Sequence, residues 1–475
     1  MNRSNIWIHI CVALILVTLA AVLGQISKLR SGLRPQTAET RDLARPVAKP
    51  TTIKRAVSES EPEVLVRFKK NVTRAQIDKL VAKNNDRIED RLELVAGLKA
   101  VDDMDNADPE TVAQQYASMT DLVEYAEVNY EIILDEQEVV PVLEHLDKPS
   151  PAAPNDPHFG DQWGLNNDGQ NGGKKGADVA ATKAWETTKG SEEVVVAVLD
   201  TGVDYTHPDL VSNMWIRPDN IPAYTDPELG TFNDRYGFNA ADNLADPMDD
   251  NGHGTHCAGI IGAEGDNGIG IVGVNWKVRI MPLKFLGRGG FGSTKDAIEA
   301  INYAVDRKKK GVNVRIISAS WGSTMRSKAL EDAIRAAGEH GILFVAAAGN
   351  SGTDNDKRPH FPSNYDLPNV VSVAALDRSD ALASFSNFGA NTVHVAAPGK
   401  EIVSTWLKGA YREASGTSMA TPHVAGIAAL LLAADPDISV EKLKKRIIAA
   451  SDSLDPLTGR IVSGGRINAH KVLAN

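Results

Sequence analysis

Five apolar runs of β-forming residues alternate with helical segments in the last two thirds of the chain. The runs are VVVAVLD (194–200), VRIMPLKFL (278–286), VRIISAS (314–320), ILFVAAAGN (342–350) and VVSVAAL (370–376). Segments with helical periodicity, such as STKDAIEAINYAVDRKK and SKALEDAIRAAGEHG, lie between them. Apolar strands that alternate with helices indicate a parallel sheet covered by helices on both faces. The pattern therefore predicts an α/β domain over residues 156–475.

The chain begins with a segment of secretory character. Residues 1–24 contain Arg3 and then an apolar run over residues 6–23. A positive start followed by an apolar run is typical of a signal peptide, and the length of the run also permits a membrane anchor. We favour a cleaved signal peptide, and both alternatives predict that the rest of the chain is exported, either secreted or held in the cell envelope. Residues 25–60 have no periodicity and are predicted to be a linker.

A small α+β unit is predicted over residues 61–135. EVLVRF and EYAEVNYEIIL have the composition of strands, and TRAQIDKLVAKNN has helical spacing with Thr73 as its N-cap. A second linker, with four prolines, follows over residues 136–155.

The net charge restricts the possible partners, and the small number of cysteines restricts the possible disulfides. The formal net charge of -11 argues against nucleic acid or an anionic membrane as the main partner. The short basic run at residues 307–310 is predicted to be the solvated end of a helix. The two cysteines are Cys11, in the N-terminal apolar run, and Cys257. Removal of that run would leave one thiol and no intrachain disulfide.

Asp200, His253 and Ser418 are the candidate catalytic residues. Asp200 ends an apolar run, and functional groups of parallel sheets gather at the carboxyl ends of strands; capping of the next element is its alternative role. His253 stands between glycines that permit close backbone approach. Ser418 precedes a small-residue helix whose first turn is expected to contain Pro422. Its hydroxyl would then lie at a helix N-terminus, which favours a developing negative charge.

These three residue types form a nucleophile, a base and an orienting group. A hydroxyl attacks well only when an imidazole takes its proton, and a carboxylate fixes the imidazole tautomer. His256 stands three residues after His253, and this pair of histidines suggests a zinc site as an alternative. The zinc signal is weak because no thiolate or glutamate stands where a third ligand is needed.

The chain order Asp200, His253, Ser418 is that of subtilisin. The motifs DTGVDYTHPDL, NGHGTHCAG and GTSMATPHVAG resemble those of the subtilisin family of serine endopeptidases, in particular its thermitase-like branch. The resemblance covers residues 155–475 and implies a three-layer α/β fold with a mostly parallel central sheet. It also implies that Asn350, in AAAGNSG, stabilises the oxyanion together with the Ser418 N–H; a turn asparagine is the alternative. Cys257 fits the thermitase-like pattern, and we expect it to be a packed thiol.

The same resemblance implies how a substrate binds. An extended peptide would pair with two segments through main-chain hydrogen bonds; they are Ser320-Trp321-Gly322 and Gly290-Phe291-Gly292. The first specificity pocket would be lined by residues 320–322 and by Ala347 to Gly349. Because these segments contain no acidic residue, strict selection of Arg or Lys is not expected, and we expect a medium or large apolar residue before the scissile bond.

Calcium is the cofactor that the resemblance implies. The expected ligands are Asp156, Asp209 and Asn267, with main-chain carbonyls near Gly265, Ile269 and Ile271, and oxygen ligands from several loops suit Ca²⁺. Asp266 is an alternative to Asn267. Asp242 and Asp246 form either a second calcium site or a solvated acidic loop.

Residues 61–135 resemble the inhibitory pro-domain of the family, which would assist folding, occupy the active site and be cut off within residues 136–155. The expected partners are protein or peptide substrates and this pro-domain. Two other classes of function remain open. An inactive peptide-binding relative would not need an intact triad, and a peptide ligase would need water excluded near Ser418, where no inserted segment is seen. The natural substrate and the oligomeric state are not indicated by the sequence.

Overall fold

A computed structural model describes residues 63–135, 139–142 and 154–474. The expectations for residues 1–24 and 25–60, and for most of the 136–155 linker, lie outside these residues. The predicted strands and helices of the α/β domain are all present, with ends that differ by a few residues from the apolar runs.

Nine strands form the main sheet, in the order β10-β11-β7-β13-β14-β15-β16-β20-β19. Every neighbouring pair is parallel except β19 and β20. The chain enters the sheet at β7, adds β10 and β11 on one side and then continues from β13 on the other. A crevice is expected where the strand order reverses, at the carboxyl end of β7. The strands are β7 (Gly190–Asp200), β10 (Phe238–Asn239), β11 (Lys277–Lys284), β13 (Val314–Ala319), β14 (Leu343–Ala347), β15 (Val370–Leu376), β16 (Val395–Pro398), β19 (Ser451–Ser453) and β20 (Gly465–Ile467).

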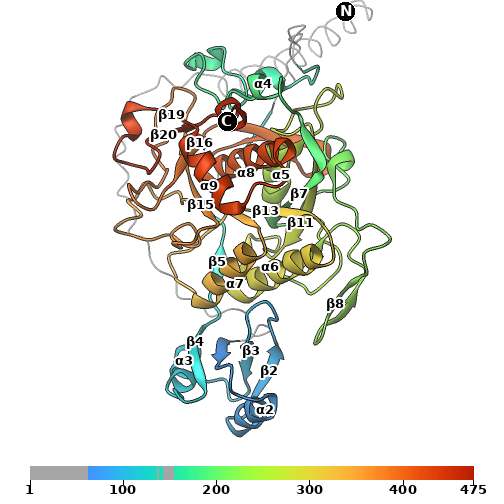
Figure 1. Cartoon of the computed structure of the whole chain (residues 1–475), viewed down its shortest axis with the longest axis vertical. Helices are drawn as coiled ribbons and strands as arrows, with labels where there is room; N and C mark the ends of the chain where they lie inside the picture. The colour runs from blue at the N-terminus through green and yellow to red at the C-terminus, as the bar shows by residue number, and fades with distance from the viewer. Residues whose placement is uncertain (1–62, 136–138, 143–153, 475) are drawn as a thin grey trace, which may run out of the picture. The chain divides into compact units, whose positions relative to one another are not determined.

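Helices cover both faces of this sheet (Figure 1). Val196 and Val198 of β7 share one apolar core with α5, α8 and α9, whereas Ala197 and Leu199 share the other with α6 and α7. Successive strand residues thus point into different cores, which explains why the runs are apolar throughout. The helices are α4 (Ala181–Ala184), α5 (His253–Gly262), α6 (Thr294–Lys309), α7 (Lys328–Glu339), α8 (Thr417–Ala434), α9 (Val440–Ala449) and α10 (Ala469–Leu473).

Among the described residues, α8 is the one helix whose length and apolar character would permit it to cross a membrane. It is almost entirely buried in the protein, and it contacts β7, β13, β14, β15 and β16. Its composition is therefore that of a core helix.

The N-terminal α+β unit is a four-stranded antiparallel sheet in the order β2-β3-β1-β4 with two helices. Val64 and Val66 pack against α2 and α3, and the intervening Leu65 joins the core beneath α6 and α7. Both faces of this sheet are thus covered, one of them by the α/β domain. As predicted, Thr73 caps α2, in a capping box with Gln76. The elements are β1 (Val64–Phe68), α2 (Arg74–Lys83), β2 (Asp86–Asp90), β3 (Leu98–Asp103), α3 (Pro109–Ala117) and β4 (Val123–Val128).

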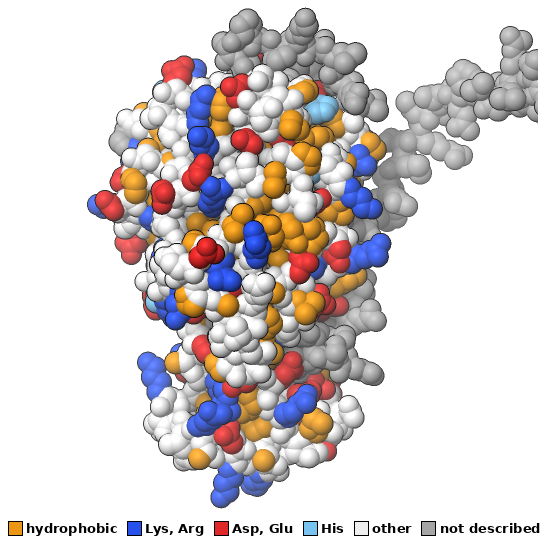
Figure 2. Space-filling view, turned by 90° about the vertical axis from the view of Figure 1, so that its right-hand side faces the viewer, with side chains coloured by type: hydrophobic (Ala, Val, Ile, Leu, Met, Phe, Trp, Pro, Cys, Tyr) orange, Lys and Arg blue, Asp and Glu red, His pale blue; other side chains and the backbone are white. Residues whose placement is uncertain are grey.

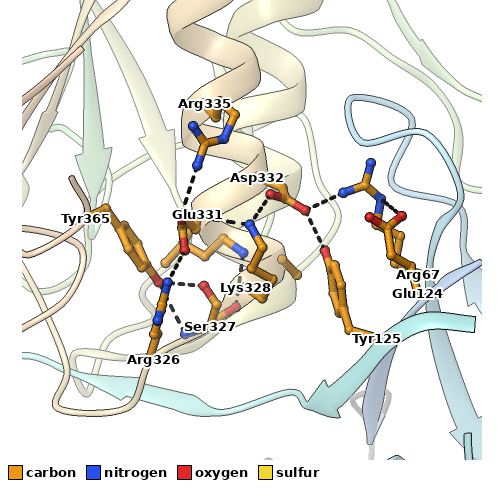
Figure 3. Close-up of polar contacts among 12 residues, drawn as sticks. Arg67, Glu124, Tyr125, Arg326, Ser327, Lys328, Glu331, Asp332, Arg335 and Tyr365 are labelled. Carbon is orange, nitrogen blue, oxygen red and sulfur yellow. Dashed lines mark hydrogen bonds and ion pairs between the residues drawn. The ribbon is translucent and has the colours of Figure 1, made fainter. Parts of the chain in front are cut away.

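Polar contacts join β4 to the N-terminus of α7 (Figure 3). The carboxylate of Glu127 accepts hydrogen bonds from the Ser327 hydroxyl at 2.5 Å and from the Lys328 N–H at 2.8 Å. The carboxylate of Asp332 on α7 accepts hydrogen bonds from Arg67 Nη1 at 2.5 Å and from the Tyr125 hydroxyl at 3.0 Å. A carboxylate at a helix N-terminus satisfies free N–H groups and interacts favourably with the helix dipole. Ser327 itself caps α7 through the Leu330 N–H, and the α+β unit adds a partner for N–H groups of the first turn that would otherwise meet solvent.

The predicted solvated helix end is wrong for Arg307. Its side chain is buried, and Nη1 donates to Asp234 Oδ2 at 3.1 Å and to the Pro222 carbonyl at 2.7 Å. Lys309 and Lys310 are exposed, as expected. On the face drawn in Figure 2, acidic and basic side chains are interspersed rather than segregated.

Candidate active site

Asp200 and His253 are in direct contact. Nδ1 of His253 lies 2.7 Å from Oδ1 of Asp200, where β7 ends and α5 begins. A Cβ atom on Gly254 would lie 2.1 Å from the carbonyl oxygen of Gly202. Only glycine therefore allows α5 to start this close to the strand, and that approach puts the imidazole beside the carboxylate.

The surroundings of His253 favour its charged form. Burial lowers the pKa of His253, whereas the charge and the hydrogen bond of Asp200 raise it, and the net pKa lies above its ordinary value of 6.5. Asp200 is itself fully buried, which keeps its charge unscreened by water. This is the arrangement that stabilises an imidazolium.

Asp249 is a residue of this site that the sequence-based prediction missed. It is buried, and its oxygens accept the N–H groups of Asn251, Gly252 and Thr255 at 2.9 to 3.0 Å. These bonds fix the start of α5, so Asp249 caps the helix that carries His253. Its signal in the sequence is an aspartate shortly before the helix, which is a capping pattern.

Ser418 is the second residue of α8. Its hydroxyl donates to the Ser320 carbonyl at 2.8 Å, and its own carbonyl accepts the Ser320 hydroxyl at 2.8 Å and the Cys257 thiol at 3.5 Å. That carbonyl makes no hydrogen bond within the helix, because Pro422, four residues on, has no N–H to donate. Pro422 therefore lies in the second turn of α8, which corrects the prediction that placed it in the first turn.

Asn350 is oriented by the residue that precedes Ser418. Its Oδ1 accepts the Thr417 N–H at 2.8 Å and the Thr417 hydroxyl at 2.9 Å. Its Nδ2 donates to a carboxylate oxygen of Asp135 at 2.8 Å. The Ser418 N–H, in the first turn of α8, has no acceptor within the helix. Two donors are thus available for a negative oxygen, and an anionic oxygen already contacts one of them.

Residues 131–135 lie along the site as an extended segment. β5 (Glu131–Ile133) pairs antiparallel with β12 (Phe291–Ser293), with Ile132 opposite Gly292. The Leu134 N–H donates to the Gly290 carbonyl at 2.9 Å. The two glycines predicted to bind substrate thus hold a segment of the chain itself.

A second strand lies on the other side of the 136–138 gap in the described residues. β6 (Val139–Pro141) pairs antiparallel with β18 (Ala410–Ala414), which pairs in turn with β17 (Ile402–Trp406). β18 ends just before the turn that carries Ser418. The chain therefore pairs with the α/β domain on both sides of this gap.

The two segments predicted to line the first specificity pocket come together around a histidine. Gly322 and Gly349 both lie against the ring of His360, for which no sequence pattern gave a signal. Ala347 is the last residue of β14. The Trp321 side chain is buried and donates to the Leu199 carbonyl at 2.9 Å, so only the main chain of Trp321 can contact a substrate.

The predicted calcium ligands lie near one another. Asp156 and Asp209 are buried; burial raises their pKa values to about 6 and about 7, and the charge of Asp156 contributes to the shift of Asp209. Oδ1 of Asp156 has no hydrogen-bond partner among the described residues. The Asn267 side chain donates to Asp209 Oδ1 at 2.9 Å, and the Asp266 N–H donates to Asp156 Oδ2 at 2.8 Å, so both alternatives lie at this site.

These residues fit a hard cation. Burial raises the pKa of both carboxylates, the charge of Asp156 adds to the shift of Asp209, and one Asp156 oxygen has no partner among the described residues, so a positive charge here would be stabilising. The N–H groups of Ile269 and Ile271, rather than their carbonyls, contact Asn267 Oδ1 and Asp209 Oδ2.

The alternative metal sites receive less support. Asp242 and Asp246 are exposed and contact Asn239 and Tyr205 respectively, as expected for a solvated loop. His256 is buried, with Nε2 3.1 Å from the Ile402 carbonyl, and burial lowers its pKa to about 3. It is a neutral core histidine.

A family model described as the subtilase family matches residues 191–464. This range contains Asp200, His253, Asn350 and Ser418. The chain belongs to the subtilase family. The resemblance to subtilisins and the predicted α/β fold are thereby confirmed, and this subtilase is a serine endopeptidase.

Two curated relatives of this subtilase cover most of its length. A thermophilic serine proteinase of Bacillus sp. (strain AK1) is 35% identical over 421 residues, which are 86% of this chain and 87% of the relative. The thermitase of Thermoactinomyces vulgaris is 36% identical over 320 residues, 67% of this chain and 99% of the relative. A solved structure of proteases from Pseudoalteromonas arctica has a TM-score of 0.56 and 29% identity, covering 68% of this chain and 99% of that one.

Cys257 of this subtilase is a packed thiol, as expected. It is fully buried on α5, and burial raises the pKa of the thiol well above its ordinary value. A protonated, inaccessible thiol is chemically inert.

Proposed function

We propose that this subtilase is an exported, calcium-binding endopeptidase made as a precursor. Its α+β unit would inhibit the enzyme until the chain is cut at the start of the 136–155 linker. The observation that carries the proposal is the path of residues 131–135, which pair with β12 as a substrate strand would and end at Asn350.

In the proposed mechanism, Ser418 attacks the scissile carbonyl and His253 takes its proton. Because the hydroxyl donates to the Ser320 carbonyl in the precursor, it has to turn to the imidazole before attack. Asp200 holds the imidazole tautomer and stabilises its charge. The Asn350 amide and the Ser418 N–H then bind the oxyanion. Water hydrolyses the acyl-enzyme, with His253 as base again.

The proposed inhibition follows from the same contacts. β5 occupies the strand-binding segment, and an Asp135 oxygen occupies the Asn350 donor. The Glu127 cap on α7 and the shared core under α6 and α7 hold the α+β unit in place. A peptide substrate would have to displace all of these interactions.

Calcium, when bound, would supply positive charge between the loops that carry Asp156, Asp209 and Asn267. Burial raises the pKa values of the two aspartates to about 6 and about 7, and a bound cation would favour their charged forms. Export rests on the sequence of residues 1–24, and the proposal keeps both the signal peptide and the anchor.

The test is to express residues 25–475 with calcium and to compare the intact masses of the wild type and Ser418→Ala. We expect the wild type to separate into two fragments and the variant to stay whole. If both stay whole while folded, the catalytic proposal fails. If both are cut alike, self-processing fails, and an added peptide then tests the enzyme. Hydrolysis adds water to the products, whereas ligation does not, and a binding relative leaves the peptide intact.

A further inference from the structure

The His360 ring lies between the two segments predicted to line the first specificity pocket. A Cβ atom on Gly322 would lie 2.0 Å from its Cε1, and a Cβ atom on Gly349 would lie 3.0 Å from its Cδ2. The imidazole therefore fills the space between the two segments predicted to line this pocket. In both segments, glycine is the residue that leaves room for the ring.

The main chain around His360 is held firmly. Its N–H donates to Asn364 Oδ1 at 3.1 Å, and its carbonyl accepts the Ser363 hydroxyl at 2.7 Å. The next residue, Phe361, exchanges two main-chain hydrogen bonds with Ser323, at 2.7 and 2.8 Å. Ser323 directly follows Gly322, so these bonds tie the histidine to the segment that forms one wall of the pocket.

The His360 ring has an unused polar atom. Nδ1 is buried and, among the described residues, has no hydrogen-bond partner. A buried imidazole nitrogen without a partner is costly, and a ligand group can supply the missing hydrogen bond. The charge that acts on this ring belongs to Asp135; it opposes the effect of burial, which lowers the pKa of His360.

Asp135 occupies the place of the residue before the scissile bond. It directly follows Leu134, the last residue whose N–H bonds to Gly290. Its carboxylate contacts Asn350, and its charge acts on both His253 and His360. A residue that contacts the oxyanion donor, and whose charge acts on both the base and the pocket histidine, is placed for cleavage after it.

We propose that His360 makes this subtilase cut after acidic residues, by pairing its imidazole with the carboxylate of an Asp or Glu immediately before the scissile bond. The first such bond is the chain's own Asp135–Glu136, whose hydrolysis breaks the C–N bond and adds one water. The inference rests on the proposed function, because His360 acts only on a chain that Ser418 attacks. It differs from the apolar preference expected from the lining segments alone.

The chemistry separates an acid from its isosteres. A carboxylate accepts from Nδ1 when that nitrogen carries the proton, and it attracts the protonated ring. An asparagine of the same shape lacks that charge, and an apolar side chain leaves Nδ1 without a partner. Sites built around a polar contact reject analogues that lack it more strongly than apolar pockets reject analogues of altered size.

The test uses the mature enzyme and peptides that differ only at the residue before the scissile bond, which is Asp, Asn or Leu. We expect kcat/KM to be at least about tenfold higher for Asp than for Asn or Leu. His360→Gln and His360→Leu should abolish this preference, and a cooperative thermal unfolding transition would show that the variants fold. A wild type that treats Asp and Asn alike, or variants that keep the preference, would overturn the inference.

Processing of the precursor gives an independent readout. The released N-terminal fragment should end at Asp135, Asp135→Asn should slow its release, and Asp135→Glu should restore it. Equal rates for Asp135→Asn and the wild type would contradict the inference. A wild type that cuts the Leu peptide fastest would contradict the proposed preference for acidic residues and leave the proposed protease activity standing. A wild type that, like Ser418→Ala, leaves every peptide intact overturns the proposed function as well.

Discussion

Thr417 holds Asn350 in one orientation, through its main-chain N–H at 2.8 Å and its hydroxyl at 2.9 Å from Oδ1. The residue next to the candidate nucleophile thus aims the candidate oxyanion donor, and the two groups cannot move independently. The amide also caps α8 from another part of the chain, since Gly416 has no side chain with which to do so.

Asn350→Leu should therefore lower kcat on the order of 10²–10³-fold with little change in KM, because the lost donor acts on the transition state. That range comes from subtilisin, a relative of this chain. Steady-state kinetics on an added peptide provide the measurement. Thr417→Val, which keeps the N–H and loses the hydroxyl, should cost much less, and an equal loss in both variants would argue against separate roles.

Asp200→Asn should lower kcat on the order of 10⁴-fold, because the imidazole loses its orienting charge. It should also shift the acid limb of the kcat/KM profile. The base must be neutral, and removal of the Asp200 charge takes away the largest effect that opposes burial, so the pKa of His253 falls and the limb moves to lower pH. A limb that stays in place would show that another group controls it.

Glu127→Ala should weaken binding of the separately made α+β unit to the Ser418→Ala enzyme. Loss of a helix cap costs about 1–2 kcal/mol, equivalent to roughly 5–30-fold in Kd. Glu124→Ala is the matched control, because Glu124 forms an exposed ion pair with Arg67 at 3.3 Å and such pairs contribute little. Equal increases in Kd for both variants would show that Glu127 does not stabilise the complex by capping α7.

Binding of the α+β unit should also weaken as pH rises from 5 to 8. Burial and then the charge of Asp90, on β2, raise the pKa of Glu299, on α6, from 4.5 to about 8. The bound state holds its proton more tightly than the free enzyme, so association is favoured at low pH and loses that advantage through this window. Calorimetric Kd values should rise with pH, and Glu299→Gln should flatten the trend; a Kd that falls with pH would contradict the linkage.

Chelation of calcium should lower the melting temperature of the Ser418→Ala enzyme, which cannot digest itself. A cation present at 100 times its Kd contributes about 2.7 kcal/mol of stability. Asp209→Asn should abolish the calcium response, whereas Asp242→Asn, in the exposed loop, should keep it. If the effect of calcium on the melting temperature were lost only in Asp242→Asn, the calcium site would lie in that loop instead.

Much of the fold follows from local patterns. The five apolar runs predicted β7, β11, β13, β14 and β15 of the main sheet, and Thr73 predicted the start of α2, because these signals act within one turn or one strand. Arg307 shows the limit of such patterns. A basic run at a helix end indicates solvent, yet the strand and loop that bring Asp234 to Arg307 are distant in sequence.

The sequence by itself determined the residue types of the site and the elements that carry them. Asp200 closes a strand, His253 opens a helix between glycines, and Ser418 opens another. Their surroundings became visible only in the folded chain: His360 lies against Gly322, Asp135 contacts Asn350, and Glu127 reaches the start of α7. The physical reason is the distance along the chain over which each interaction acts. Capping, periodicity and motif spacing depend on neighbours in the chain, whereas the shape and charge of a pocket depend on which distant segments the sheet brings together.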